Sequence, residues 1–191
     1  MYPQFNVATA LTWLRIAAIP AVVLVFYIPG EWMRPAASMI FAIACITDWF
    51  DGYLARRMGQ TSQFGAFLDP VADKLMIAVA LVLILQADNR KTIAFVAAII
   101  IGREIAVSAL REWMAELGAR SRVAVSGIGK AKTTMQMIGV GCMLFARDLF
   151  GLPVYDVGLA LLIVAAGITL WSMVGYIKAA WPRIGDREQV S

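Results

Sequence analysis

The sequence contains six long apolar stretches separated by short polar breaks, and this alternation constrains the fold more than any other feature. The stretches cover residues 8–28, 35–57, 66–87, 91–114, 126–147 and 155–178. A helix needs about 20 apolar residues to cross the hydrocarbon core of a bilayer. Within lipid, each backbone polar group must find its partner inside the segment, which favours helices over open strands. The sequence therefore predicts an all-α integral membrane protein with six transmembrane helices.

The amino-acid composition also indicates an integral membrane protein. Hydrophobic residues make up 61% of the chain and charged residues 16%, whereas soluble domains average about 45–50% and about 25%. The chain shows no tandem repeat, low-complexity tract or linker, so residues 1–191 are expected to form a single domain. The basic residues are scattered over helix ends and form no continuous basic face, which argues against nucleic-acid binding.

The connections between the predicted helices differ in basic content, and cytoplasmic loops are the ones enriched in Lys and Arg. The connections after the second and fourth predicted helices, together with the C-terminal region, hold Arg56, Arg57, Arg111, Arg120, Arg122, Lys130, Lys132, Lys178, Arg183 and Arg187. The opposite side holds only Arg34, Arg90, Lys91 and Arg147. Both termini are therefore expected in the cytoplasm.

Four aspartates, Asp48, Asp51, Asp69 and Asp73, flank the connection between the second and third predicted helices. A spacing of three or four residues places each pair on one face of its helix. Ionised carboxylates at membrane depth are costly, and four together would repel each other unless cations lay among them. Hard divalent cations such as Mg²⁺ prefer oxygen ligands and often share them with substrate phosphates. The pattern therefore predicts a two-metal centre, open to the cytoplasm, that handles a phosphate or pyrophosphate.

A simpler interpretation pairs these aspartates with Arg56, Arg57 and Lys74, but it leaves the small residues beside them unexplained. Gly52, Ala55 and Gly65 occupy fixed offsets from the carboxylates. Each alone suits close helix packing, whereas together they favour a slot for a flat group such as a nucleobase and its ribose. Arg56 suits bidentate binding of a phosphate, its alternative being an arginine that extends to the membrane interface. The chain has no histidine, so a general base is sought among these carboxylates.

The spacing D-x2-D-G-x2-A-R-x8-G-x3-D-x3-D, which runs from Asp48 to Asp73, resembles the signature of the CDP-alcohol phosphotransferase family. The resemblance implies that Asp48, Asp51 and Asp69 hold two divalent cations, Mg²⁺ or Mn²⁺. It also implies that Asp73 contributes to the second metal and acts as the general base. The expected contacts to the cytidine lipid CDP-diacylglycerol are Thr9, Thr12, Gly52, Ala55, Arg56, Ser62 and Gly65. Many relatives read N-I-P-N-x-L-T-x-x-R near the start, where this chain has Ala8 and Thr9 in place of the proline and the second asparagine.

Basic residues further along the chain point to the second substrate. Arg103 and Arg111 lie eight residues apart within one apolar stretch and so nearly share a helix face, and Lys132 follows in the next stretch. Together they predict a pocket for an acceptor alcohol that carries a phosphate. The alternatives are charges that set the topology, or arginines neutralised by Glu104 and Glu112.

Residues 102–118 and 123–134, with the chain length, resemble the bacterial members of the family that use sn-glycerol 3-phosphate as the acceptor. The resemblance places the protein in the bacterial cytoplasmic (inner) membrane, and we expect a homodimer. Other acceptors, namely inositol phosphate, serine or phosphatidylglycerol, stay open. Two rivals from other classes are a UbiA-type prenyltransferase, which would be a longer chain, and a divalent-cation carrier, which would need carboxylates near the middle of the membrane.

Overall fold

The computed structural model describes the backbone of residues 7–58, 63–116 and 127–188, and the side chains of residues 12–47, 68, 71–110, 112–113 and 132–173. These ranges fold into six helices and contain no strand. The helices are α1 (Val7–Tyr27), α2 (Met33–Met58), α3 (Gln63–Ala87), α4 (Lys91–Glu116), α5 (Gly127–Phe145) and α6 (Val154–Glu188). The predicted all-α fold and the six helical stretches are confirmed. Helix α6 continues ten residues beyond the predicted end at residue 178, because the loss of apolar side chains ends a membrane-embedded stretch without ending a helix.

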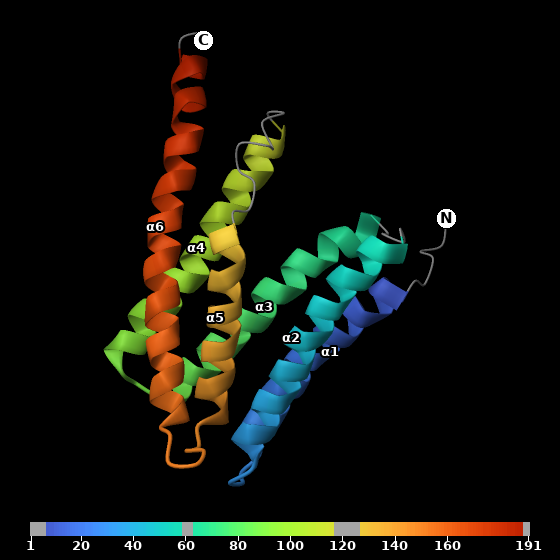
Figure 1. Cartoon of the computed structure of the whole chain (residues 1–191), viewed down its shortest axis with the longest axis vertical. Helices are drawn as coiled ribbons and strands as arrows, with labels where there is room; N and C mark the ends of the chain where they lie inside the picture. Colours follow the sequence, from blue (N-terminus) through green and yellow to red (C-terminus); the bar gives the residue numbers. More distant parts are fainter. Residues whose placement is uncertain (1–6, 59–62, 117–126, 189–191) are drawn as a thin grey trace.

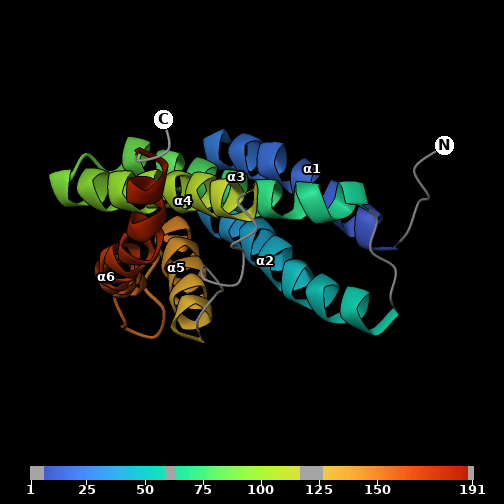
Figure 2. The same ribbon diagram turned by 90° about the horizontal axis from the view of Figure 1, so that it is seen from above.

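The helices form a ring. Among the residues that the structure describes, α1 packs on α2, α2 on α5, α5 on α6, α6 on α4, α4 on α3, and α3 returns to α1. Helices α3 and α5 also pack on each other, which divides the ring into two groups of four. We call them the α1 half (α1, α2, α3 and α5) and the α6 half (α3, α4, α5 and α6). Figure 1 shows α1, α2 and α3 diverging from α4, α5 and α6 toward the upper end of the molecule, and Figure 2 shows the same helices from above.

Alternate helix ends lie at the same end of the ring. Helices α1, α3 and α5 begin, and α2, α4 and α6 end, toward the upper end in Figure 1. We call this the motif end, because the segment that carries the aspartates turns there from α2 into α3. The connections 28–32, 88–90 and 146–153 lie at the opposite end. The first helix therefore begins, and the last helix ends, on the side of the molecule that carries the motif.

The interior is apolar and tightly packed. Its largest fully buried side chains include Phe41, Leu81, Ile84, Ile100 and Met143, and most of the buried hydrophobic residues form one connected cluster.

Two glycines bring α5 and α6 close together. A Cβ atom on Gly158 would lie 2.8 Å from the backbone oxygen of Gly139 and 2.8 Å from the Cβ of Cys142. Such distances leave no room for a side chain, as is common where membrane helices meet through small residues.

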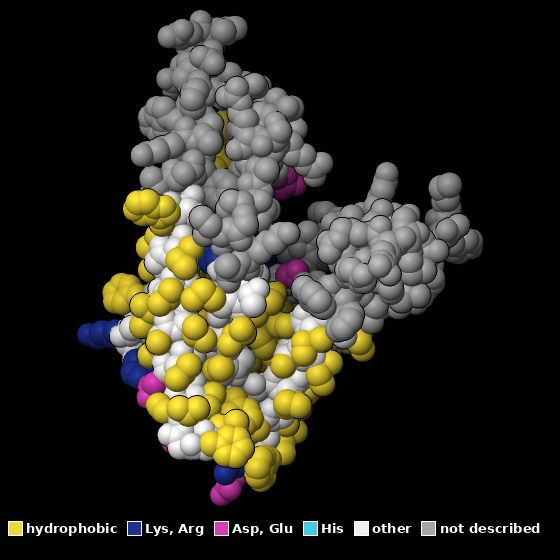
Figure 3. All heavy atoms as spheres, viewed as in Figure 1, with side chains coloured by type: hydrophobic (Ala, Val, Ile, Leu, Met, Phe, Trp, Pro, Cys, Tyr) yellow, Lys and Arg dark blue, Asp and Glu magenta, His cyan; other side chains and the backbone are white. Residues whose placement is uncertain are grey.

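The outer surface is apolar as well. Exposed large hydrophobic side chains occur on all six helices, among them Leu24, Met39, Val82, Phe95, Ile138 and Trp171. Hydrophobic side chains cover much of the described surface in Figure 3. Within the described residues, two stretches are long and apolar enough to cross a membrane, Lys91–Leu110 and Val154–Met173, and shorter apolar stretches occur at Thr12–Tyr27 and Met33–Thr47. The fold is thus an all-helical bundle with the surface of a membrane protein.

Candidate functional site

The backbone places the four motif aspartates at matching depths on α2 and α3. Asp48 and Asp51 lie ten and seven residues before the end of α2, and Asp69 and Asp73 lie six and ten residues after the start of α3. At about 1.5 Å per residue, all four positions are about 9–15 Å along their helices from the motif end. Gly52, Ala55 and Arg56 follow on the last turns of α2, and Gly65 belongs to the first turn of α3.

Several of the predicted site side chains lie outside the described ones, namely those of Thr9, Asp48, Asp51, Ala55, Arg56, Asp69 and Arg111, and Ser62 lies outside the described residues altogether. Among the side chains that are described, no group of three or more His, Cys, Asp or Glu residues could hold a metal ion. Since three of the four predicted ligands fall outside that set, the metal centre stays a prediction.

Asp73 forms an ion pair with Arg15 of α1. Nη1 of Arg15 lies 3.0 Å from Oδ1 of Asp73, with Arg15 only 2% exposed and Asp73 30% exposed. Thr12, predicted to contact the lipid nucleotide, is also buried and lies one helical turn before Arg15. A small cavity beside the pair is lined by Ala44, Cys45, Met76, Ile77 and Met137, so all four helices of the α1 half surround Asp73.

Arg15 was not among the residues predicted for the site, although the sequence contained a signal. A charged side chain within an apolar membrane helix needs a partner. This holds for Arg15 as it does for Arg103 and Arg111. In an apolar environment, breaking such a pair by removing one partner is costly, because it leaves an uncompensated charge. Arg15 therefore belongs to the immediate surroundings of the aspartate motif.

A second charged cluster lies in the α6 half and contains two of the three residues predicted to bind the acceptor phosphate. Nη1 of Arg103 lies 2.7 Å from Oε1 of Glu104, and Nζ of Lys132 lies 3.4 Å from the same oxygen. Nη2 of Arg103 donates to Oγ of Ser172 at 3.4 Å, which ties the cluster to α6. The structure thus brings Arg103 and Lys132 together through Glu104, the residue considered as a neutralising partner of Arg103. Their role toward an acceptor stays a prediction.

This second cluster is buried and carries an excess of positive charge. Arg103 is 9% exposed and Lys132 is 3% exposed, against 27% for Glu104. Two cations and one carboxylate leave these three side chains with a net charge of +1. Among the described atoms, Nε of Arg103 is buried without a hydrogen-bond partner. Buried positive charge of this kind favours the binding of an anion.

Helix α3 separates the two clusters. Asp73 belongs to the first, and the next residue, Lys74, lines a cavity of about 140 Å³ between α3 and α4 together with Glu104. Successive residues of a helix point about 100° apart, so Asp73 and Lys74 on one turn of α3 can face different halves of the ring. Lys74, the residue after Asp73, and Glu104 of the second cluster therefore line the same cavity.

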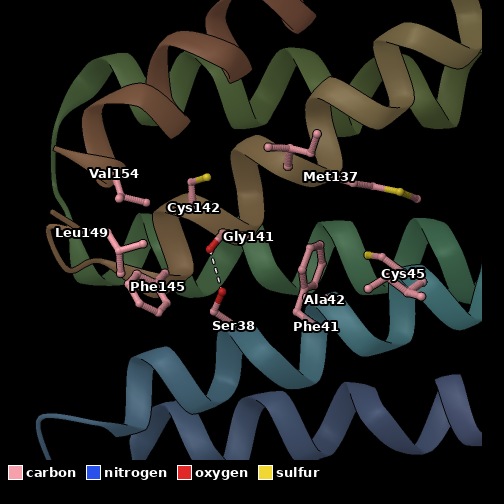
Figure 4. Close-up of a pocket in the computed structure, with 12 residues that line it drawn as sticks. Ser38, Phe41, Ala42, Cys45, Met137, Gly141, Cys142, Phe145, Leu149 and Val154 are labelled. Carbon is pink, nitrogen blue, oxygen red and sulfur yellow. Dashed lines mark hydrogen bonds between the residues drawn. The ribbon is translucent and has the colours of Figure 1, made fainter. Parts of the chain in front are cut away.

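An apolar groove of about 420 Å³ runs between α2 and α5 toward the connection before α6. Figure 4 shows Ser38, Phe41, Ala42 and Cys45 of α2 facing Met137, Gly141 and Cys142 of α5, with Leu149 and Val154 at the far end. Oγ of Ser38 donates a hydrogen bond of 2.8 Å to the carbonyl oxygen of Gly141. Cys45 and Met137 also line the cavity at Asp73, so the groove and that cavity lie on two sides of the same pair of side chains.

The chain is similar to known proteins over most of its length. The model of a family described as CDP-alcohol phosphatidyltransferase matches residues 5–173. A protein of Shigella flexneri serotype 5b (strain 8401) named CDP-diacylglycerol–glycerol-3-phosphate 3-phosphatidyltransferase is 54% identical over 177 residues, which cover 93% of this chain and 96% of that protein. A protein of the same name from Escherichia coli (strain K12) is 53% identical over the same shares of the two chains.

Proposed function

Because the chain belongs to the CDP-alcohol phosphatidyltransferase family, we propose that it transfers the phosphatidyl group of CDP-diacylglycerol to sn-glycerol 3-phosphate. The products are phosphatidylglycerol phosphate and CMP, which makes the protein a phosphatidylglycerophosphate synthase. The observation that carries this proposal is the 53–54% identity, over 93% of the chain, to proteins named for that reaction. The buried basic cluster beside α3 agrees with an acceptor that carries a phosphate.

Two divalent cations, Mg²⁺ or Mn²⁺, would be held by Asp48, Asp51, Asp69 and Asp73. The residues fit such ions, because all four donors are carboxylates, which hard divalent cations prefer. They lie at matching depths on two consecutive helices, and four carboxylates need more positive charge than Arg15 supplies to Asp73. When bound, the cations would grip the pyrophosphate and offset the charge that develops on it.

Asp73 would act as the general base. The acceptor hydroxyl attacks the phosphorus that bears the diacylglycerol, its proton passes to the Asp73 carboxylate, and the bond from that phosphorus to the oxygen of CMP breaks. Arg15 holds the carboxylate from the α1 side, while Lys74, on the same turn of α3, faces the cavity next to the basic cluster. The acceptor hydroxyl would therefore approach Asp73 from the α6 half, with its phosphate near Arg103, Lys132 and Arg111.

The lipid substrate would occupy the α1 half. Gly52, Ala55 and Gly65 leave room for the cytidine, Arg56 and Ser62 contact the nucleotide, and Thr9 and Thr12 complete the site from α1. The groove between α2 and α5 suits an acyl chain, because it is apolar and shares Cys45 and Met137 with the cavity at Asp73.

In the membrane, all six helices would span the bilayer, with both termini and the active site on the cytoplasmic side of the bacterial inner membrane. The alternation of helix ends, the exposed apolar side chains on every helix and the basic residues at the motif end support this arrangement. We further propose that the protein forms a homodimer.

One assay tests the reaction and its metal dependence. Purified protein is given CDP-diacylglycerol with glycerol 3-phosphate, glycerol, serine or inositol phosphate, and CMP release and product masses are measured. We expect CMP and phosphatidylglycerol phosphate with glycerol 3-phosphate alone, no turnover in excess chelator, and recovery with Mg²⁺ or Mn²⁺. Ca²⁺ should restore little activity, because it prefers more ligands at longer distances. Full turnover in excess chelator would contradict the metal centre, and a different product lipid would change the acceptor.

A further inference from the structure

Glu104 occupies an unusual position in the buried basic cluster. A single oxygen of this side chain accepts from Arg103 of its own helix and from Lys132 of α5, at 2.7 Å and 3.4 Å. Consecutive residues on a helix point about 100° apart, so the backbone does not require Arg103 and Glu104 to meet. The two cations draw the carboxylate toward them, and it becomes their shared ligand.

The same side chain borders the space from which an acceptor would arrive. Glu104 and Lys74 line the cavity of about 140 Å³ between α3 and α4, and a water molecule occupies about 30 Å³ in the liquid. The cavity could hold a few water molecules, but Leu75, Ile77, Ala78, Ile100, Ile101 and Ile105 form the rest of its lining, so Glu104 is its acidic group and Lys74 its basic one. Glu104 is 27% exposed, against 9% for Arg103 and 3% for Lys132, so an anion that approaches the two cations would meet this carboxylate first.

Carboxylate and phosphate oxygens accept the same charge-assisted hydrogen bonds from Arg and Lys. We infer that Glu104 is a placeholder for the phosphate of the acceptor: it holds Arg103 and Lys132 together while the pocket is empty and withdraws when a phosphate takes its place. This inference rests on the proposed function, since the phosphate is that of the acceptor alcohol.

Such a placeholder makes Glu104 a specificity-determining residue. An acceptor with a phosphate can displace the carboxylate, because it brings more negative charge and more acceptor oxygens to the same donors. Plain glycerol has no anionic group with which to compete. The competition also weakens the binding of phosphate, since only molecules whose carboxylate has withdrawn can accept it.

The inference is tested with Glu104→Gln in the full-length protein, because glutamine keeps the shape of the side chain and removes its charge. Binding of inorganic phosphate is measured by calorimetry in detergent. One competing charge-assisted hydrogen bond corresponds to roughly 10–150-fold in affinity, so we expect Glu104→Gln to bind phosphate at least ~10-fold more tightly than the unaltered protein. The KM for glycerol 3-phosphate should fall in parallel, while the KM for CDP-diacylglycerol and the poor use of glycerol stay unchanged.

The control is Glu31→Gln, which removes the same charge from an exposed residue in the connection between α1 and α2 and should leave phosphate binding unaltered. Glu104→Asp keeps the charge but shortens its reach, so we expect a smaller gain, and this variant decides alone if Glu104→Gln does not fold. Phosphate binding that is unchanged or weaker in the Glu104 variants would overturn the inference and make Glu104 a structural partner. The binding measurement needs no turnover, so it stays decisive even if the unaltered protein does not use glycerol 3-phosphate.

Discussion

At the scale of single residues, Asp73 is the motif aspartate whose surroundings the structure describes, and the proposed roles predict different effects for it and for Asp69. Asp73→Asn should reduce turnover at least ~10²-fold, the low end for a lost general base, because the amide cannot accept the proton of the acceptor hydroxyl. Asp69→Asn should instead raise the Mg²⁺ concentration needed for half-maximal activity. CMP release across a Mg²⁺ titration, together with equilibrium binding of CDP-diacylglycerol, distinguishes the two variants.

Two other outcomes for Asp73→Asn would contradict its role as the general base. If Asp73→Asn turns over at a near-normal rate, another base must act. If the variant loses CDP-diacylglycerol binding together with turnover, Asp73 serves the lipid rather than the proton.

Sequence patterns predicted the motif aspartates from their spacing but not their partners. Spacing along a helix determines which residues share a face of that helix, whatever neighbour the helix packs against. Whether Arg15 meets Asp73 depends instead on α1 packing against α3, two helices separated in the chain by α2. The meeting of Lys132 with Glu104 depends in the same way on α4 and α5 both packing on α3 and α6. Apolar periodicity contains no signal for such neighbours, because nearly every face of these helices is apolar.

At the scale of elements, the close contact of α5 and α6 gives a stability prediction. Gly158→Ala would place a methyl group 2.8 Å from the Gly139 oxygen and from the Cβ of Cys142, so the helices must separate. Forcing extra volume into a packed contact typically costs about 1–3 kcal/mol. We expect a loss of that order in reversible unfolding in mixed micelles.

Gly167→Ala is the matched control, because it lies on the same helix and a Cβ there would have no atom within 4 Å. It should be neutral or slightly stabilising, since glycine within a helix costs about 0.5–1 kcal/mol relative to alanine. Equal effects of the two substitutions would show that helix propensity, rather than close packing, determines the outcome at Gly158.

The connection between α3 and α4 is held to α6 by a second element-scale contact, which depends on pH. The hydroxyl of Tyr155 donates to Asp88 at 2.7 Å, and the backbone N–H and Nε of Arg90 donate to the same carboxylate at 3.0 Å and 2.8 Å. Burial raises the pKa of Asp88, but these hydrogen bonds outweigh it and lower the pKa below its usual value. The folded state therefore favours the ionised carboxylate.

Because the pKa of Asp88 is lower in the folded protein than in the unfolded chain, this contact stabilises the fold more at higher pH. The contact contributes fully to stability above the unfolded pKa of Asp88, about 3.9, and the contribution is lost as the pH falls through the lower folded pKa. Thermal unfolding between pH 6 and pH 3 should therefore show Asp88→Asn less stable at pH 6, with the difference shrinking toward pH 3. Asp148→Asn, at the same end of the molecule, serves as control. A constant difference across this range would contradict the account.

The helices themselves were the most predictable part of the fold. Five of them end within a few residues of their predicted bounds, because Pro29-Gly30, Asp88-Asn89-Arg90 and Gly151-Leu152-Pro153 interrupt the apolar stretches clearly. The ring order could not be predicted, since it depends on local shape such as the glycine contact between α5 and α6.

At the scale of the whole molecule, the proposed sites for the two substrates lie in different halves of the ring. The lipid nucleotide would enter the α1 half, where the apolar groove meets the cavity at Asp73, and the water-soluble acceptor would enter the α6 half, where the buried charges lie. Only α3 and α5 belong to both halves. This division explains how one protein could bind a lipid and a polar metabolite without either crossing the path of the other.

The same arrangement makes the orientation testable. If six helices cross the bilayer, then the start of α3 and the end of α6 face the cytoplasm, whereas Asn89, between α3 and α4, faces the opposite side. Single cysteines at these three positions, Gln63→Cys, Asn89→Cys and Glu188→Cys, are introduced after both native cysteines are replaced by alanine. A membrane-impermeant maleimide is then added to cells whose outer membrane has been removed.

Asn89→Cys should react in intact cells, and the other two only after the membrane is opened, because a charged reagent does not cross the hydrocarbon core. Labelling of Glu188→Cys together with Asn89→Cys in intact cells would mean that at least one helix does not span the membrane. Labelling of Gln63→Cys and Glu188→Cys, with Asn89→Cys protected, would keep the fold but reverse its orientation. The aspartate site would then face away from the cytoplasm, where CDP-diacylglycerol and glycerol 3-phosphate would have to reach it, and the proposed function would be contradicted by topology alone.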